Sequence, residues 1–346
     1  MKHQTTRYGE IPFYKIGTFG NTADAFISKK LFLEYKTKYS FPKKGDILIS
    51  ASGTIGRAVI YDGKPAYFQD SNIVWIDNDE TLVKNDFLFY AYSNVKWNTE
   101  HTTILRLYND NFRNTLIPLP PLNEQIAIAD ILSGLDRYLY ALDALILKKE
   151  SVKKALSFEL LSQRKRLKGF NQAWQRVRLG DIANYLTSNL SVEQITQQGK
   201  IKVYDVNNFI GYTDTTFISD KPYISIVKDG SVGRVRILPP KTNILSTMGA
   251  LIANHRTTTE FLFYLLSNFD FKNFISGSII PHIYFKDYKE KTIFLPPLNE
   301  QIAIANILSD VDHEITSLKN KKSQFDNIKK ALNHDLMSAK IRVLKK

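Results

Sequence analysis

One fifteen-residue segment occurs twice in this chain, and this repeat constrains the fold more than any other feature. The copies are LPPLNEQIAIADILS at 119–133 and LPPLNEQIAIANILS at 295–309. They differ only where Asp130 stands against Asn306, and they lie 176 residues apart. Because solenoid repeats have periods of about 20–50 residues, a period this long predicts two domain-sized halves.

A weaker similarity precedes each copy. The segment FLFYAYSN from Phe87 matches FLFYLLSN from Phe261, and ISASGTIGRAVIY from Ile49 resembles ISIVKDGSVGRVRIL from Ile224. The second alignment places a Gly-x-x-Gly-Arg motif in both halves, made of Gly53, Gly56 and Arg57 in the first and of Gly230, Gly233 and Arg234 in the second. Each half is therefore a variable segment followed by a nearly invariant one.

The invariant segments are predicted to be long helices. Two prolines, which fit just before a helix, precede Asn123 and Asn299 as expected N-caps. Glu124 and Glu300 then place negative charge at the positive end of the helix dipole. The expected apolar seam is Ile128, Leu135 and Leu142 with Ile131, Tyr138 and Leu145 in the first helix, and Ile304, Val311 and Leu318 with Ile307 in the second. Such heptads favour a coiled coil, so we expect a helix over 122–166 to pair antiparallel with its counterpart.

The variable segments have the pattern of mixed α/β domains. Short β-prone runs broken by Gly, Asp and Pro at 46–79 predict strands and turns, and 201–246 repeats this pattern. The two FLFY segments predict short helices that follow the strands. We therefore divide the chain into four parts, which are 1–118, 119–168, 169–294 and 295–346.

Composition limits the class of function. The chain has 47 Lys and Arg against 34 Asp and Glu, a formal net charge of +13, which favours a polyanionic partner such as nucleic acid. It has no cysteine, which excludes disulfides, a thiol nucleophile and thiolate metal sites. No apolar run approaches the roughly 20 residues that cross a bilayer, and the N-terminus has no signal-peptide core. We expect a cytoplasmic protein with no membrane partner.

Motifs that would carry catalysis are missing from the sequence. None of the Pro-Pro pairs lies in the Asn/Asp-Pro-Pro-aromatic loop that an adenine methyltransferase needs, and no GxxxxGK[ST] phosphate loop is present. The six histidines, which include His3 and His101, show no metal-ligand spacing. We expect a chain that is not an enzyme and holds no cofactor or metal of its own.

The repeated LPPLNEQ helix behind each variable domain resembles the DNA-specificity subunit of Type I restriction–modification systems, over essentially the whole chain. The resemblance implies an α/β (α+β) fold with two target-recognition domains, 1–118 and 169–294. Two long antiparallel coiled-coil spacer helices would separate them in a pseudo-twofold internal repeat. It also implies that the chain recognises a bipartite, asymmetric double-stranded DNA target. Two methyltransferase subunits and the restriction subunits would be its partners, and they would carry S-adenosylmethionine, ATP and Mg²⁺.

The first domain departs from the second in one respect. The second domain opens with a lead-in, Trp174-Gln-Arg-Val-Arg-Leu-Gly-Asp-Ile182, that has the pattern of an opening strand. Only ten residues precede Ile11, whereas the matching Ile201 follows about thirty residues of the second domain. The sequence therefore predicts either a truncated N-terminus or a shortened variant of the first domain.

Candidate DNA-contacting residues lie in the Gly-x-x-Gly-Arg motifs, before each helix and in one further loop. They are Gly53, Thr54, Arg57, Arg106, Tyr108, Asn109, Asn111 and Arg113 in the first half, and Gly230, Ser231, Arg234, His255, Arg256, His282, Tyr284 and Lys286 in the second. Tyr108 matches Tyr284, whereas Arg106 stands against His282. Polar side chains that differ within a shared frame suit the reading of two different half-sites. Tight turns with ordinary surface variation are the alternative.

The identical helix starts are candidates for binding the partner subunits. These residues are Leu122, Asn123, Glu124 and Gln125 in the first copy and Leu298, Asn299, Glu300 and Gln301 in the second. Two other classes of function stay open. The chain could be a structural coiled-coil scaffold whose basic domains bind DNA without specificity, or a self-sufficient endonuclease or methylase.

Overall fold

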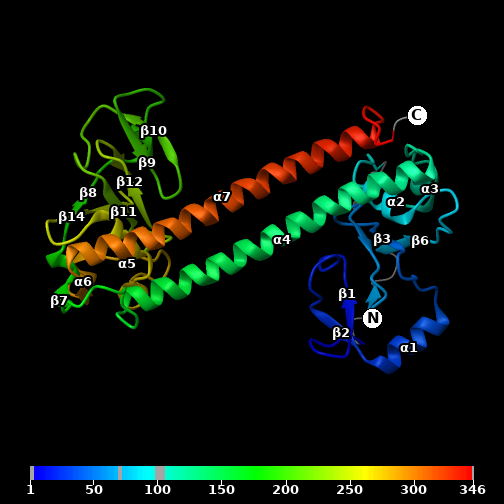
Figure 1. Cartoon of the computed structure of the whole chain (residues 1–346), viewed down its shortest axis with the longest axis horizontal. Helices are drawn as coiled ribbons and strands as arrows, with labels where there is room; N and C mark the ends of the chain where they lie inside the picture. The colour runs from blue at the N-terminus through cyan, green and yellow to red at the C-terminus, as the bar shows by residue number, and fades with distance from the viewer. Residues whose placement is uncertain (1–3, 69–71, 98–105, 345–346) are drawn as a thin grey trace. The chain divides into compact units, whose positions relative to one another are not determined.

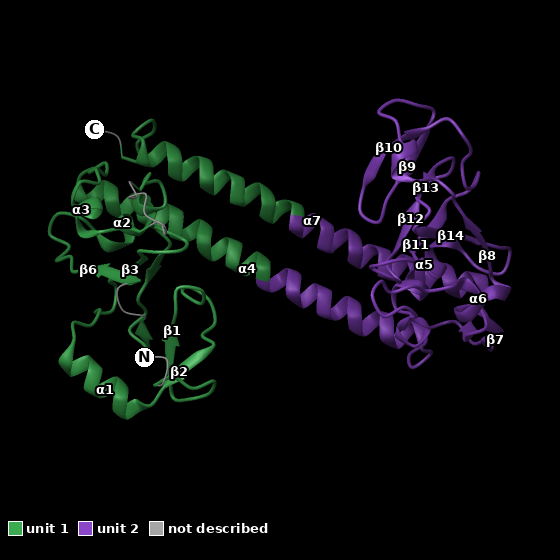
Figure 2. Ribbon diagram, turned by 180° about the vertical axis from the view of Figure 1, so that it is seen from behind, with its two compact units in different colours: residues 1–143, 320–346 green, residues 144–319 purple. Residues whose placement is uncertain are grey.

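The computed structural model describes residues 4–68, 72–97 and 106–344. It forms two compact units, one made of residues 1–143 and 320–346 and the other of residues 144–319 (Figure 2). Two long helices, α4 (Leu122–Leu161) and α7 (Leu298–Met337), each begin in one unit and end in the other. We call the first unit, with the N-terminal globule, unit 1 and the second unit 2.

Unit 1 contains two three-stranded sheets, with orders β2-β1-β5 and β4-β3-β6 (Figure 1). Helix α2 packs on β3 and β4, and its Phe87, Tyr90 and Ala91 join Ile128 and Leu132 of α4 in one apolar cluster. The elements of its globule are β1 (Ile11–Tyr14), β2 (Ala25–Ile27), α1 (Lys29–Lys38), β3 (Ile47–Ser50), β4 (Ala58–Ile60), β5 (Tyr67–Phe68), β6 (Ile73–Ile76), α2 (Asn85–Tyr92) and α3 (Asn109–Arg113).

Unit 2 contains a four-stranded sheet, β12-β11-β14-β8, a three-stranded sheet, β10-β9-β13, and the pair β15-β7. Helix α5 packs on the four-stranded sheet, and its Phe261 and Leu262 share the largest apolar core with Ile304 and Leu308 of α7. The elements are β7 (Gln175–Arg178), β8 (Ala183–Thr187), β9 (Ile201–Tyr204), β10 (Phe209–Thr213), β11 (Tyr223–Val227), β12 (Val235–Leu238), β13 (Asn243–Ile244), β14 (Met248–Ala253), α5 (Thr259–Ser267), α6 (Phe285–Tyr288) and β15 (Thr292–Leu295). Short 3₁₀ turns lie at Leu179–Asp181, Val192–Gln194 and Lys272–Phe274.

The two globules are copies of one plan. In unit 1 the first strand β1 pairs antiparallel with β2 and parallel with β5, and in unit 2 β9 pairs in the same way with β10 and β13. The sheet β4-β3-β6 likewise corresponds to β12-β11-β14. Strands β7 and β8 have no counterpart among the described residues of unit 1. The predicted mixed α/β fold with an internal repeat is confirmed.

Helices α4 and α7 each have 40 residues, a length of about 60 Å at 1.5 Å per residue. In both units they run antiparallel, because higher residue numbers on α4 face lower numbers on α7. In unit 1 Asp143 of α4 lies 2.7 Å from Lys322, and Asp136 pairs with Lys329. In unit 2 Lys149 of α4 lies 2.7 Å from Glu314 of α7. The predicted antiparallel helix pair is therefore present within each unit, although α4 ends at Leu161 and does not reach residue 166.

Half of the predicted seam is displaced by one residue. Ile128 is buried as predicted, but Ile131 and Leu145 are exposed, and their neighbours Leu132 and Ile146 are buried in their place. In a heptad, the spacing between successive seam residues alternates between three and four. Ile131 and Leu132 are both apolar, as are Leu145 and Ile146, so either residue of each pair could occupy the seam. The pattern of apolar residues alone could not decide between them.

The expected N-caps are also wrong. The backbone N–H groups of Glu124 and Gln125 both donate to the carbonyl of Pro121, so the helix starts at Leu122 and Asn123 lies inside its first turn. In the second copy Gln301 donates to the carbonyl of Pro297 in the same way. Proline can precede a helix because only its N–H is missing, and its carbonyl remains free to accept.

Candidate nucleic-acid interface

The Gly-x-x-Gly-Arg motif of unit 1 forms the loop between β3 and β4. Gly53 and Gly56 have φ values of 68° and 79°, a conformation that favours glycine. A Cβ on Gly56 would lie 2.2 Å from the indole nitrogen of Trp97, so only glycine fits there. Thr54 is exposed at the tip, and Arg57 donates from Nη1 to the carbonyl of Phe19 at 3.0 Å. Arg57 therefore uses one of its guanidinium donors for a hydrogen bond within its own unit.

The matching motif of unit 2 forms the loop between β11 and β12. Gly230 and Gly233 have φ values of 83° and 81°, and Gly230 and Ser231 are exposed. A Cβ on Gly230 would meet no atom within 4 Å, so the space above this residue is open. Arg234 is also exposed, which leaves its guanidinium available to an anion.

The structure brings each loop together with the segment that precedes the long helix. In unit 1 Arg106 forms an antiparallel bridge with Ser52, and the N–H of Leu107 donates to the carbonyl of Ala51 at 2.8 Å. In unit 2 His282 and Asp229 form the same bridge. Two segments chosen independently from the sequence therefore form one surface in each unit, held by the same backbone contacts.

Around His282 the side chains form a polar, aromatic site. His282 Nδ1 lies 2.6 Å from Asp229 Oδ1, and the ring stacks beside Tyr284 with centroids 6.4 Å apart. Lys286 Nζ lies 5.5 Å from the centre of the Tyr284 ring. A cleft of about 350 Å³ adjoins these residues and is lined partly by Tyr185. Because a carboxylate only accepts, Asp229 fixes a hydrogen on Nδ1 and leaves Nε2 to a ligand.

Burial raises the pKa of the Tyr185 hydroxyl in this cleft, and the nearby Asp229 charge acts in the same direction. The Tyr185 ring also stacks on Phe285 with centroids 4.6 Å apart. Tyr185 and Asp229 were missed in the sequence, although Asp229 directly precedes the glycine motif. For Asp229 the available signal was its place directly before the Gly-x-x-Gly-Arg motif, whereas the sequence held no such signal for Tyr185.

The corresponding surface of unit 1 is built differently. Tyr108 is exposed and caps α3, and its N–H donates to Asn111 Oδ1 at 2.6 Å. That bond occupies part of the Asn111 amide. Arg113 lies 3.5 Å from Asp110 with both side chains exposed, and Asn109 is exposed as well.

Two candidates of unit 2 lie away from this surface. His255 and Arg256 follow the last residue of β14, whereas the glycine loop lies beside the first residue of β14, because Val227 pairs with Met248. Arg256 Nη2 donates to Gln175 Oε1 at 3.2 Å, and its carbonyl accepts from Gln301. His255 and Arg256 therefore lie near the start of α7 and not at the surface that contains His282.

The Glu-Gln pairs at the helix starts point inward. Glu124 Oε2 lies 2.5 Å from Arg342 Nη2, and Glu300 Oε2 lies 2.6 Å from Arg166 Nη2. The hydrogen bond from Arg342 lowers the pKa of Glu124. Glu300 also accepts from the Trp174 indole at 3.0 Å. All four Glu and Gln side chains are buried, so only the leucines and asparagines of the predicted partner-binding set, Leu122, Asn123, Leu298 and Asn299, are exposed.

The two glutamines hold the globules to the helices. Gln125 Nε2 donates to the carbonyls of Leu82 and Pro120, at 3.1 and 2.8 Å. Gln301 Nε2 donates to the carbonyls of Arg256 and Pro296, at 2.9 and 2.8 Å. Identical residues at the two helix starts thus make equivalent contacts within their own units.

A Tyr-Asp-Lys cluster, which we did not predict, is also repeated. In unit 1 Tyr90 donates to Asp136 at 2.7 Å, and Lys329 pairs with the same carboxylate. In unit 2 Tyr264 donates to Asp312 at 2.9 Å, and Lys153 lies 2.5 Å from that carboxylate. Burial first and the carboxylate second raise the pKa of both tyrosines. Asp136 and Asp312, like Lys153 and Lys329, are 176 residues apart, and this offset was the overlooked signal.

The described residues contain no group of three or more side chains that could hold a metal ion, and His3 and His101 lie outside them. None of the helices described is long and apolar enough to span a bilayer.

The family model for the Type I restriction modification DNA specificity domain matches residues 1–150 and 171–325. The chain belongs to this family. The two matches fall on the two halves of the repeat, so each half is one copy of the specificity domain.

Proteins related to this specificity chain come from bacteria and archaea. A Haemophilus influenzae protein assigned as type I restriction enzyme specificity subunit S.HindORF215P is 65% identical over 133 residues, which cover 38% of this chain and 34% of that protein. This chain thus matches about a third of that relative's length. The MjaX specificity subunit of Methanocaldococcus jannaschii is 28% identical over 337 residues, covering 86% of this chain and 79% of that one.

Solved structures share the fold. The Type I restriction–modification S subunit from M. genitalium has a TM-score of 0.63 at 20% identity, with 97% of this chain and 91% of that chain covered. A chain from a study of complex assembly and conformational transition in the type I R-M system has a TM-score of 0.53 at 15% identity, with 85% and 82% covered.

Proposed function

We propose that this chain is the non-catalytic specificity subunit of a Type I restriction–modification complex and binds a bipartite, asymmetric sequence in double-stranded DNA. The observation that carries the proposal is the repeated surface. In both units the same backbone bridges join a glycine loop to the segment before the helix, while the side chains there differ. A common frame with Arg106 in one copy and His282 in the other suits two different half-sites.

The chemistry of each surface matches groups on DNA. Arginine and lysine contact phosphates or guanine edges, and an imidazole Nε2 lone pair can accept from a base amino group. The net charge of +13 supplies the sequence-independent part of the affinity. DNA reading is assigned to residues 1–118 and 169–294, and partner docking to 119–168 and 295–346.

The proposed partners are two methyltransferase subunits, joined by restriction subunits. Leu122 and Ile126 of α4 and Leu298 and Ile302 of α7 are exposed large apolar residues at equivalent positions. Equivalent apolar patches suit two copies of one partner, because each copy would meet the same surface. S-adenosylmethionine, ATP and Mg²⁺ would be bound by those partner subunits. A DNA ligand with such partners implies a cytoplasmic protein.

Binding-site selection with the reconstituted methyltransferase complex tests the proposal. We expect enrichment of one gapped sequence with two unlike halves, and an affinity that falls steeply with salt because phosphate contacts release counterions. Enrichment of no defined sequence would favour the scaffold alternative. Cleavage or methylation of DNA by the purified chain alone would show that it is an enzyme.

A further inference from the structure

The segment before α6 in unit 2 forms a closed loop over residues 276–282. The N–H of Ser276 donates to the carbonyl of His282 at 2.9 Å, and the N–H of His282 donates back to the carbonyl of Ser276 at 2.7 Å. Gly277 has a φ of 89°, and a Cβ on it would lie 2.3 Å from the carbonyl oxygen of Ile280. Only glycine fits at this position, so the loop is held in one tight turn.

The same loop is fastened to the glycine loop between β11 and β12. The N–H of Gly230 donates to the carbonyl of Pro281 at 2.9 Å, and the N–H of Ile283 donates to the carbonyl of Lys228 at 2.9 Å. These two bonds lie on either side of His282 in the sequence. The base of the 276–282 loop is therefore fixed to the surface that carries the candidate base-reading residues.

The tip of the loop exposes two large apolar side chains. Ile279 is 92% exposed, and its neighbour Ile280 is 54% exposed. A single exposed apolar side chain is ordinary, because a protein has too little polar surface to cover itself. Here the loop cannot fold its tip back onto unit 2 without breaking the backbone bonds at its base. A bound ligand is therefore the available way to bury Ile279.

The surroundings of the tip carry the charge that suits a DNA ligand. Arg234 and Lys286 of the same surface are exposed, and the exposed Lys272 begins the 3₁₀ turn that leads into the loop. His282 closes the loop three positions after Ile279. Cationic side chains contact phosphates, and an apolar tip between them meets the bases.

We propose that Ile279 is a wedge that inserts between two adjacent base pairs of the half-site bound by unit 2 and bends the duplex there. Proteins that kink DNA insert isoleucine, leucine and similar side chains into base steps, and the bend brings more of the duplex into contact. Steps that unstack easily would be favoured, which adds sequence preference without a hydrogen bond to a base edge. The inference rests on the proposed DNA-binding function and deepens it.

DNA bending by the reconstituted methyltransferase complex tests this inference. The duplex carries the sequence obtained by binding-site selection, and energy transfer between dyes at its two ends reports the bend. Ile279→Ala should reduce the bend by at least about 20°, the lower end for wedge insertion, and weaken binding about tenfold. Ile279→Leu keeps an apolar wedge and should preserve both the bend and the affinity.

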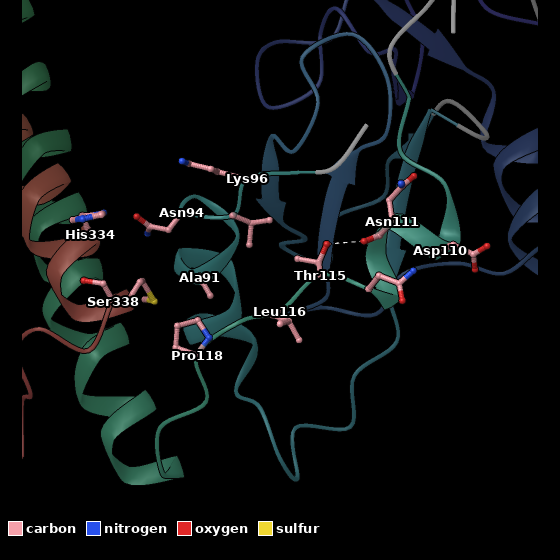
Figure 3. Close-up of a pocket in the computed structure, with 13 residues that line it drawn as sticks. Ala91, Asn94, Lys96, Asp110, Asn111, Thr115, Leu116, Pro118, His334 and Ser338 are labelled. Carbon is pink, nitrogen blue, oxygen red and sulfur yellow. Dashed lines mark hydrogen bonds between the residues drawn. The ribbon is translucent and has the colours of Figure 1, made fainter. Parts of the chain in front are cut away.

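Leu116 of unit 1 provides a matched control. It is 94% exposed, but it lies beside Pro118 at a cavity of about 630 Å³ whose other side is lined by His334 and Ser338 of α7 (Figure 3). None of residues 53–57, all of which the structure describes, lines this cavity. Leu116→Ala removes a side chain of similar size and exposure, and should leave the bend unchanged and the affinity within about twofold.

A scan of nicked duplexes locates the base step. A nick in one strand lowers the cost of deforming the step that it interrupts, so the wild-type complex should bind one nicked duplex at least about threefold more tightly than the intact one. That nick should lie in the half whose base preference His282→Ala relaxes. The Ile279→Ala complex should show no such preference.

Three results would overturn the inference. An Ile279→Ala complex that bends the selected duplex as the wild type does would show that Ile279 does not insert, while the proposed function would stand. Loss of the methyltransferase subunits from the Ile279→Ala chain would show that the tip contacts a protein partner. Failure of the wild-type complex to select any sequence would contradict the proposed function, and the inference with it.

Discussion

Units 1 and 2 share the contacts that hold each globule to the long helices. They differ in the side chains of the surface formed by the glycine loop and the segment before each helix. The Glu-Arg pairs, the buried glutamines and the Tyr-Asp-Lys clusters recur at matched positions, with nearly the same distances. The loop and pre-helix segments keep their backbone bridges but exchange Arg106 for His282. Buried polar contacts tolerate little change, because an unpaired buried group costs about 1–3 kcal/mol, whereas exposed side chains are free to diverge.

The pairing of helices follows the same rule in both units. In each unit the start of one long helix is paired with the segment that follows the other, as Glu124 with Arg342 and Glu300 with Arg166 demonstrate. Each unit therefore needs both helices to be complete. The comparison between units predicts that a substitution that removes one of these contacts destabilises only the unit that contains it.

The largest expected effect follows replacement of the buried glutamines. Gln301→Leu leaves two carbonyls and the donors of Thr257 and Thr258 unpaired, and should destabilise unit 2 by about 3 kcal/mol. Gln125→Leu should do the same to unit 1. Hydrogen exchange resolved by unit measures both effects.

The neighbouring exposed residues provide the control. Ile302→Gln and Ile126→Gln change no buried contact, and we expect each to shift stability by less than about 0.5 kcal/mol. If Gln301→Leu increased exchange equally in both units, the idea that each unit is held by its own contacts would be wrong.

The next largest effect is expected for substitutions that change recognition of one DNA half-site. Arg106→Ala and His282→Ala should each relax base preference in only one half of the DNA target, by about 1–3 kcal/mol. Asp229→Asn should act in the same half as His282→Ala, because it removes the carboxylate that orients the imidazole. Binding-site selection with each variant complex measures this. Loss of preference in both halves from a single substitution would contradict modular reading.

The sequence predicted much of this organisation, for a definite reason. A repeat of fifteen residues fixes the number of halves, and apolar periodicity fixes helices, so both depend on local pattern alone. The bridge between Ser52 and Arg106 could not be predicted: Arg106 and the neighbouring Gly53 were separate candidates, and the contact between their segments depends on the sheet. The inward direction of Glu124 and Gln125 could not be predicted, since their partners Arg342 and Leu82 are distant in sequence.

The paired tyrosines test whether the two units are energetically as well as geometrically equivalent. Tyr90→Phe and Tyr264→Phe each remove one hydrogen bond to an aspartate that keeps its lysine partner, so each should cost about 1 kcal/mol. The two costs, measured by exchange in the respective units, should agree within about 0.5 kcal/mol. A larger difference between the two free-energy changes would mean that the two clusters are packed differently although their hydrogen-bond distances are similar.

The smallest effect is the response of unit 1 to acid. Hydrogen bonding from Arg342 lowers the pKa of Glu124 below its ordinary value of 4.5. A carboxyl whose pKa is lower in the folded state stabilises that state above the unfolded pKa, and this stabilisation is lost as pH falls through the folded pKa. Unit 1 should therefore lose protection below about pH 4.5, and Glu124→Gln should flatten that part of its profile while leaving unit 2 unchanged. Parallel pH profiles for the two proteins would show that the Glu124–Arg342 pair contributes no pH-dependent stability.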